Sequence, residues 1–272
     1  MEAHIQYVAI RSERPEKLAD FYKDHFEMSE VAHSKEGNIA LTDGFYNLSI
    51  LKIGENDRTS GFSHIGVAID DLHELVGRVE KFAAPTTRLL AEEGDVFHGD
   101  YRIHDPNGMP VSVSLNNFGL AESEPRLPSI HHIALSVPNN QAVLDFFMNV
   151  FGFRQQIHNN PNDTRPVNEN TSRGAADGVT AFQILRYPVT TSDVDPSVKL
   201  GIRHTRWGVN HLGWLVPDLD LTLKSLPEET VHQRPSSRPM AEFRGYDPDG
   251  NEFDISFSKG YQVDQKVWAK AS

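Results

Sequence analysis

Two predicted strands near the C-terminus carry side chains that bind metals. His211 lies near the start of a strand in which polar or small positions alternate with apolar ones. The sequence Asp-Pro-Asp-Gly at 247–250 is typical of a tight turn, and it leads into a strand with Glu252 and Asp254 on its polar face. Acidic side chains that face inward indicate a hydrated site rather than a sealed core. The sequence therefore predicts one cavity at which a histidine and a carboxylate meet.

Composition limits the chemistry and the partners. The chain has 272 residues, no cysteine and a formal net charge of −12. Without cysteine, disulfides, thiolate metal sites and a cysteine nucleophile are excluded, so nitrogen and oxygen must hold any metal. The negative charge argues against nucleic acid and anionic membranes as main partners. No apolar run is long enough to span a membrane and the N-terminus does not resemble a signal peptide, so we expect a cytoplasmic protein.

The order of predicted elements repeats four times along the chain. Each unit reads as strand, helix and three strands, and the units begin near residues 5, 62, 130 and 211. A unit of this size cannot bury its sheet alone, so neighbouring units should pair. We predict an α+β fold of four βαβββ modules, paired into two domains with curved, barrel-like mixed sheets. The domains span 1–118 and 130–272, and a polar, proline-containing linker at 119–129 joins them.

The strand His-Ile-Ala-Leu-Ser-Val at 132–137, the strand from His211, and the turn at 247–250 with its acidic strand resemble the vicinal oxygen chelate superfamily. This superfamily includes glyoxalase I, the bleomycin and fosfomycin resistance proteins, and the extradiol ring-cleaving dioxygenases. The resemblance covers nearly the whole chain. Its two-domain, four-module length is most similar to the extradiol dioxygenases.

The resemblance implies where the metal ligands lie, because the family takes them from the first and last strands of its modules. The corresponding residues are Tyr7, His64, His132 and His211 on the first strands, and Ser49, Ser112, Gln183 and Asp254 on the last strands. Only the second domain keeps a metal-binding set, which is His132, His211 and Asp254. The first domain is then a scaffold without a metal site. Asp254 stands where the family has glutamate, and Glu252 is the alternative ligand.

Two imidazoles and a carboxylate on one face of an ion leave adjacent positions for a diol and for dioxygen. The resemblance thus implies an Fe(II)-dependent ring-cleaving dioxygenase acting on a catechol-like aromatic diol, with Mn(II), Ni(II) or Zn(II) as other possible ions. If Gln183 also coordinates, a glyoxalase-like lyase or isomerase is the alternative. A further alternative is a non-catalytic small-molecule binding protein of the antibiotic-resistance type.

The proton-handling residues of the family are replaced here. The family tyrosine before the turn corresponds to Arg244, and two family histidines correspond to Gly178 and to residues 236–238. Tyr246 and His204 are the candidate substitutes. Arg244 is a candidate for binding a substrate carboxylate or steadying a charged intermediate.

Two long irregular stretches, 158–178 and 188–207, are rich in polar residues and proline. Loops of this length in a compact domain are commonly lids or disordered, and the first could bring Arg165 or Arg173 over the pocket. The tail at 260–272 could dock on its own domain or on a second subunit. The family resemblance implies a homo-oligomer.

Overall fold

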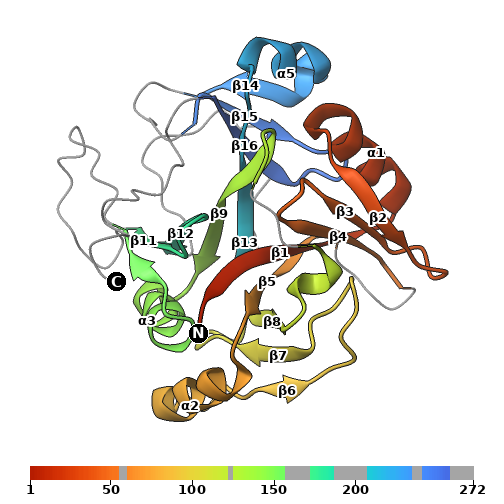
Figure 1. Cartoon of the computed structure of the whole chain (residues 1–272). Coiled ribbons are helices and arrows are strands. Elements are labelled where there is room, and N and C mark those ends of the chain that lie inside the picture. The colour runs from red at the N-terminus through yellow and green to blue at the C-terminus, as the bar shows by residue number, and fades with distance from the viewer. Residues whose placement is uncertain (55–59, 122–124, 157–171, 187–206, 235–240, 258–272) are drawn as a thin grey trace, which may run out of the picture.

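Two curved, eight-stranded mixed sheets make up most of the protein (Figure 1). The computed structural model describes residues 1–54, 60–121, 125–156, 172–186, 207–234 and 241–257. One sheet is built from the first half of the chain and the other from the second half. The predicted α+β fold of repeated βαβββ units is confirmed. The sheets are curved but are not closed barrels.

The first half contains the elements β1 (Ala3–Ser12), α1 (Pro15–Phe26), β2 (Ser29–His33), β3 (Ile39–Thr42), β4 (Asn47–Lys52), β5 (Gly61–Ile69), α2 (Leu72–Phe82), β6 (Leu90–Ala91), β7 (Tyr101–His104), β8 (Pro110–Ser114) and the 3-10 turn η1 (Asn117–Gly119). The second half contains β9 (Ser129–Val137), α3 (Asn140–Val150), β10 (Arg154–Gln155), β11 (Arg173–Ala176), β12 (Ala181–Arg186), β13 (Gly208–Leu215), α5 (Leu219–Ser225), the 3-10 turn η2 (Glu228–Thr230), β14 (Val231–Gln233), β15 (Phe243–Tyr246) and β16 (Glu252–Ser256).

Both sheets follow the same strand order. The first runs β2-β3-β4-β1-β5-β8-β7-β6, and the second runs β10-β11-β12-β9-β13-β16-β15-β14. In each sheet the first strands of two units pair antiparallel at the centre, and each of them pairs in parallel with the last strand of its own unit. The first and last strands are therefore neighbours, which is why side chains far apart in sequence can meet on one face.

Local capping explains where three of the helices begin. The side chains of Asp71, Asn139 and Asp218 accept hydrogen bonds from backbone N–H groups in the first turns of α2, α3 and α5. The helix α1 begins instead at Pro15, whose missing N–H costs nothing at a helix start. At the other end, Ala83 closes α2 in a left-handed conformation, with φ of 52°.

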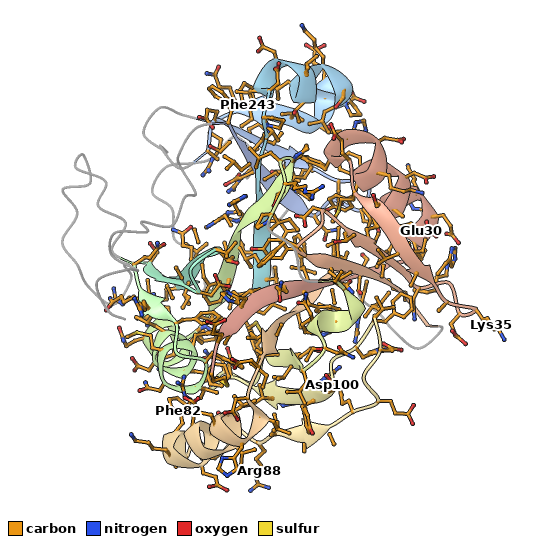
Figure 2. The ribbon with its side chains drawn as sticks, viewed as in Figure 1. Glu30, Lys35, Phe82, Arg88, Asp100 and Phe243 are labelled. Carbon is orange, nitrogen blue, oxygen red and sulfur yellow. The ribbon has the colours of Figure 1, made fainter. Side chains whose placement is uncertain are left out.

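The apolar core is continuous between the two halves. The helix α1, from the first half, lies beside α5 and the second sheet, and the ring of Phe26 stacks on that of Trp214 at 4.2 Å. The helices α2 and α3 also pack together, with Phe82 against Phe146. Figure 2 shows side chains filling the space around the sheets and helices, with Phe82 labelled. Each half thus supplies part of the apolar cover of the other.

Buried carboxylates link the halves in a reciprocal way. Asp43 accepts a hydrogen bond from the backbone N–H of Ile130 at 2.9 Å, and Asp177 accepts one from Ile5 at 2.6 Å. Tyr22 of α1 donates to Asp247 at 2.9 Å. These contacts connect the turns of one half to the strands and helices of the other, so the two halves are fixed relative to each other.

Within the described part of the chain, we find no helix that has both the length and the apolar character needed to cross a membrane. The predicted residue limits of the domains and the linker stay predictions.

Candidate functional site

The candidate site lies on the polar face of four neighbouring strands of the second sheet, β9, β13, β16 and β15. Cross-strand partners point to the same side of a sheet, so the register places side chains in rows. One row runs from His132 through Gly213 and Asp254 to Arg244. Because Gly213 has no side chain, His132 and Asp254 face each other across the backbone of β13.

A second row lies beside the first. It runs from Gln183 through Ala134, His211 and Glu252 to Tyr246. The two rows bring His132 and His211 together, with ring centroids 5.2 Å apart. Both rows end on β15, and the Phe243 label in Figure 2 marks the first residue of this strand.

The ring nitrogens of the two histidines are oriented by oxygen atoms. Nδ1 of His132 lies 2.8 Å from the carbonyl oxygen of Ala181, and Nδ1 of His211 lies 2.7 Å from the side-chain oxygen assigned to Asn210. An amide oxygen can only accept, so each Nδ1 carries a proton and donates it. In the neutral rings the lone pair is then on Nε2, which is the usual arrangement of metal-ligating histidines.

Two arginines hold the carboxylate of Asp254. Nε of Arg244 donates to Oδ1 at 2.7 Å, and a terminal nitrogen of Arg244 lies 3.2 Å from Oδ2. Arg234 donates to Oδ2 at 2.7 Å. Burial alone would raise the pKa of Asp254, but the charges of Arg244 and Arg234 and the hydrogen bond with His211 outweigh it. Its pKa therefore lies well below the usual value, and Asp254 is an anion.

The side chains of His211 and Asp254 are in contact on this face. Nε2 of His211 lies 3.3 Å from Oδ2 of Asp254, and both side chains are buried. Burial lowers the pKa of His211 more than the neighbouring carboxylate raises it, so the ring is neutral. The ring of His211 is within hydrogen-bonding distance of Asp254, and both arginines also donate to the same carboxylate oxygen.

The donor set fits a divalent ion in type, because imidazole nitrogens and carboxylate oxygens are common ligands of such ions. Ligand bonds to such ions are roughly 2.0–2.2 Å long, so two atoms 3.3 Å apart can share one ion. Among the described residues, no group of three histidine, aspartate or glutamate side chains is already arranged to hold an ion. The guanidinium contacts of Asp254 are the competing interaction, because Oδ2 accepts from both arginines.

Three further residues complete the polar face. Glu252 lies 3.1 Å from Arg244 and accepts a hydrogen bond from the hydroxyl of Tyr246 at 3.3 Å. His232 of β14 pairs with Arg244 of β15. Its ring stacks on that of Tyr246, with the ring centroids 6.0 Å apart. His232 and Arg234 were not predicted from the sequence, because the strand β14 near them has only three residues and little alternation.

Other predicted residues are not brought to the site. Gln183 shares the second row, but its amide lies 3.4 Å from Ser172, and Ala134 separates it from His211. Arg173 donates to Gln141 of α3 at 3.0 Å. His204, Arg165, residues 236–238 and the tail at 260–272 lie outside the described residues, so their predicted roles stay predictions.

The corresponding face of the first sheet is filled by aromatic rings. The ring of Phe118, from the turn η1, stacks on that of Tyr7, with the ring centroids 4.6 Å apart. Nε2 and Nδ1 of His64 lie 3.0 Å from the hydroxyls of Ser112 and Ser63. Burial lowers the pKa of His64 to about 3, so this histidine is neutral. At this face of the first sheet, the position that corresponds to Asp254 is occupied by Ser112, and the predicted scaffold role of this half stays a prediction.

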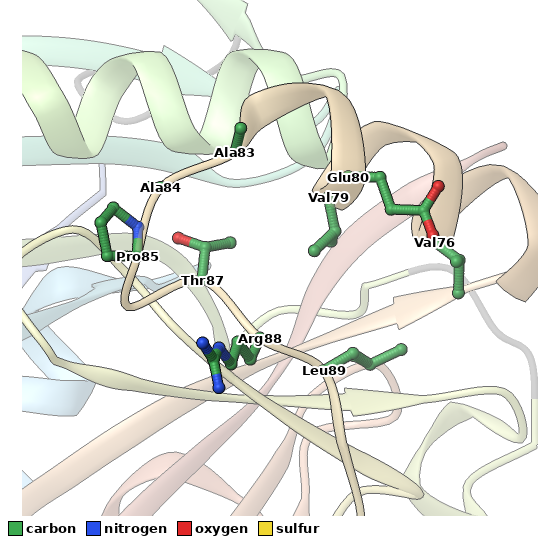
Figure 3. Close-up of a pocket in the computed structure, with 9 residues that line it drawn as sticks. All are labelled: Val76, Val79, Glu80, Ala83, Ala84, Pro85, Thr87, Arg88 and Leu89. Atoms are coloured by element: carbon green, nitrogen blue, oxygen red, sulfur yellow. The ribbon is translucent and has the colours of Figure 1, made fainter.

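A surface pocket of about 460 Å³ lies elsewhere, between α2 and the segment 83–89 (Figure 3). Its lining is mainly apolar, and Glu80 and Arg88 are its charged residues. It contains no histidine and is formed by the first half, so it is separate from the candidate site.

The paired βαβββ repeats, with a polar face at the first and last strands, define the class of fold. A sequence model of the Glyoxalase/Bleomycin resistance protein/Dioxygenase superfamily matches residues 4–113 and 129–255, and the chain belongs to this superfamily. No curated protein gives a significant sequence match.

Solved structures of several enzymes have a similar fold. The 2,3-dioxygenase LapB from Pseudomonas sp. KL28 aligns with a TM-score of 0.67 and 15% identity over 93% of this chain and 91% of that one. An extradiol ring-cleaving dioxygenase from B. fuscum aligns with a TM-score of 0.65 and 11% identity, over 94% of this chain and 71% of that one. The Mn(II)-bound glyoxalase from Novosphingobium aromaticivorans aligns with a TM-score of 0.61 and 17% identity, over 93% of this chain and 81% of that one. At these identities the likeness shows the fold alone.

Proposed function

We propose that the chain is a metal-dependent enzyme that cleaves the ring of a catechol-like aromatic diol, with dioxygen as the second substrate and Fe(II) as the ion. The observation that supports this proposal is that His132, His211 and Asp254 lie on neighbouring strands of one polar face, with the two imidazole centroids 5.2 Å apart and Nε2 of His211 3.3 Å from Oδ2 of Asp254. Similar folds in the dioxygenases from Pseudomonas sp. KL28 and B. fuscum are consistent with it.

His132, His211 and Asp254 would hold the ion. A bound ion of this kind supplies Lewis acidity toward the diol hydroxyls and, for iron, electrons for dioxygen. The chain itself orients the two imidazoles through Ala181 and Asn210 and keeps Asp254 ionised. Burial of all three side chains excludes bulk water and strengthens their electrostatic interactions.

Three other residues have proposed roles beside the ligands. Arg244, which is buried beside Asp254, would bind negative charge on the substrate. The hydroxyl of Tyr246 would donate a proton, with Glu252 as the acceptor that orients it. His204 stays a proposed proton shuttle. We further propose a homo-oligomeric, cytoplasmic enzyme.

The test is the ion content and oxygen consumption of the full chain. Protein purified without added metal is analysed for bound ions, reloaded with Fe(II) without air, and followed with an oxygen electrode on a panel of catechols. We expect bound iron and catechol-dependent oxygen uptake. His132→Gln should lose both, while His64→Gln, at the matching position of the first sheet, should keep both. Tyr246→Phe should keep the iron and lower the turnover.

Other results would overturn the proposal. Bound nickel, zinc or manganese without oxygen uptake would favour a glyoxalase-like lyase or isomerase. No ion under any loading condition would favour a small-molecule binding protein. The observation that favours this last alternative is that two arginines already balance the charge of Asp254.

A further inference from the structure

One buried ring occupies the face of the first sheet that corresponds to the candidate site. In the first sheet Tyr7 pairs with Gly66, as His132 pairs with Gly213 in the second sheet. The ring of Phe118 stacks on that of Tyr7 and is fully buried. Because glycine has no side chain, a group from elsewhere can lie directly on the sheet at this point.

The space for this ring depends on Gly66. A Cβ at this position would lie 2.5 Å from Cζ of Phe118 and 2.9 Å from Cβ of Tyr7, and both distances are too short for such a contact. The rings of Tyr7 and His64 lie side by side, with their centroids 5.5 Å apart, and Ala9 packs in the same cluster. Burial lowers the pKa of His64, so this wall is neutral. The cavity therefore has the shape and the chemistry to hold a flat, uncharged ring.

The ring that fills this cavity comes from an exposed turn. Leu115, Asn116 and Gly119 are exposed, whereas Phe118 is buried. Asn117 and Phe118 both have a positive φ, of 56° and 53°. This left-handed conformation is unfavourable for residues with a Cβ, and most of all for bulky ones. The packing of one ring thus offsets the cost of the backbone that delivers it.

Two polar side chains of the first sheet hold the backbone of Phe118. Its N–H donates to Oγ of Ser114 at 3.0 Å, and its carbonyl oxygen accepts from the side-chain amide of Asn47 at 3.2 Å. One acceptor and one donor therefore lie close to the ring. A hydroxyl group is the smallest group that can satisfy both, because it donates and accepts.

We propose that the first half contains a second ligand site, for a small neutral aromatic alcohol, and that Phe118 is its internal, displaceable occupant. The ligand ring replaces the ring of Phe118 on Tyr7, and the ligand hydroxyl takes over the contacts with Ser114 and Asn47. The site uses no metal ion and no residue of the second sheet. It is therefore independent of the proposed function.

The ligand and Phe118 exclude each other, which gives the proposal a quantitative consequence. The apparent affinity is the intrinsic affinity reduced by the fraction of molecules in which the turn is open. Substitutions in the turn change this fraction and leave the walls of the cavity as they are. Their effects on affinity therefore report on the displacement of Phe118.

Fluorine NMR of 3-fluorobenzyl alcohol measures binding to the full-length protein. Phe118→Ala removes the occupant. Asn117→Val keeps the occupant but places a β-branched residue at a positive φ, which disfavours the closed turn. Leu115→Ala, at an exposed position of the same segment, is the matched control. Thermal unfolding establishes that each variant is folded.

Opening the turn should tighten binding of the probe. Relative to the wild type, we expect about tenfold tighter binding by Phe118→Ala, about threefold tighter binding by Asn117→Val, and no change in Leu115→Ala. Cyclohexylmethanol, which has the hydroxyl but no aromatic ring, should not displace the probe.

Three results would overturn the proposal. If Phe118→Ala binds the probe and the wild type does not, Phe118 is a fixed part of the core. If all proteins bind equally, the probe lies elsewhere, as it would at the candidate site of the second half. If Phe118→Ala does not fold, the wild type and Asn117→Val decide, and equal affinities or no binding count against displacement.

Discussion

Buried aspartates in this protein have pKa values shifted in opposite directions. Asp254 is held ionised because two arginines and a histidine surround it. Asp105, in the turn before β8, is also buried, but its neighbours are backbone N–H groups. Its Oδ2 has no hydrogen-bond partner among the described residues. Burial raises the pKa of Asp105 to about 6, more than the backbone hydrogen bonds lower it. The charge of Asp105 therefore costs stability near neutral pH.

Asp105→Asn should stabilise the protein at pH 7. The amide keeps an oxygen for the N–H groups of Asn107 and Met109 and removes the buried charge. From a shift of about two pKa units we expect a gain of about 1–3 kcal/mol in the free energy of unfolding. The folded wild type binds the extra proton between the unfolded pKa of about 4 and the folded pKa of about 6, so its stability falls as pH rises through that window.

Chemical denaturation at pH 4 and pH 7 measures this effect. The advantage of Asp105→Asn should be large at pH 7 and small at pH 4. Asp145→Asn, on the exposed face of α3, is the control and should change stability little at either pH. An equal effect of Asp105→Asn at both pH values would contradict the argument.

At the scale of single elements, the helix ends offer a separate test. Ala83 adopts φ of 52° at the end of α2, a conformation that costs a residue with a Cβ roughly 1–2 kcal/mol. Ala83→Gly removes this cost but gives the unfolded chain more freedom. We expect a net gain of about 0.5–1 kcal/mol in the free energy of unfolding.

The control for the helix end is Ala84→Gly, one residue further along the chain, where φ is not positive. This substitution should destabilise the protein slightly, since it adds freedom to the unfolded chain without relieving strain. Both variants are compared with the wild type by thermal unfolding. If both substitutions changed the stability in the same direction, the left-handed conformation of Ala83 would not be the cause of the effect of Ala83→Gly.

Much of this element structure could be predicted from sequence. Alternation of apolar and polar residues identified the strands of His132, His211 and Asp254 and the faces of their side chains, because period two is a local property. The ion pairs of Asp254 could not be predicted. They depend on the register of β15 against β16, which sets Arg244 opposite Asp254, and on Arg234, which follows a three-residue strand with little pattern.

At the scale of the whole molecule, the two halves share one core. The sequence predicted that neighbouring units pair within a domain, but it could not show that α1 of the first half covers the second sheet. That arrangement depends on long-range packing of Phe26 on Trp214 and on the hydrogen bond from Tyr22 to Asp247. We therefore expect the two halves to unfold together.

Phe26→Ala tests the shared core. Phe26 is fully buried, and truncation of a buried phenylalanine costs about 3–5 kcal/mol. Although Phe26 belongs to the first half, its loss should lower the stability of both halves equally, since its ring packs on the second sheet. Calorimetry should show one transition, shifted to lower temperature. Val31→Ala, at an exposed position of β2, is the control.

Separate transitions in Phe26→Ala, with only one of them shifted, would contradict a shared core. All three tryptophans, Trp207, Trp214 and Trp268, belong to the second half of the sequence, so tryptophan fluorescence reports on that half. It should follow the same unfolding curve as the helical signal of the whole chain.

The packing of α1 on the second sheet also limits how the candidate site can be isolated. A fragment beginning near residue 129 would contain His132, His211 and Asp254, yet it would leave Trp214 and Phe253 without the rings of Phe21 and Phe26. Because both sheets have the same strand order, a second copy of the fragment offers the nearest replacement for the missing cover. Such a fragment should self-associate, and its metal chemistry would then be that of a paired assembly.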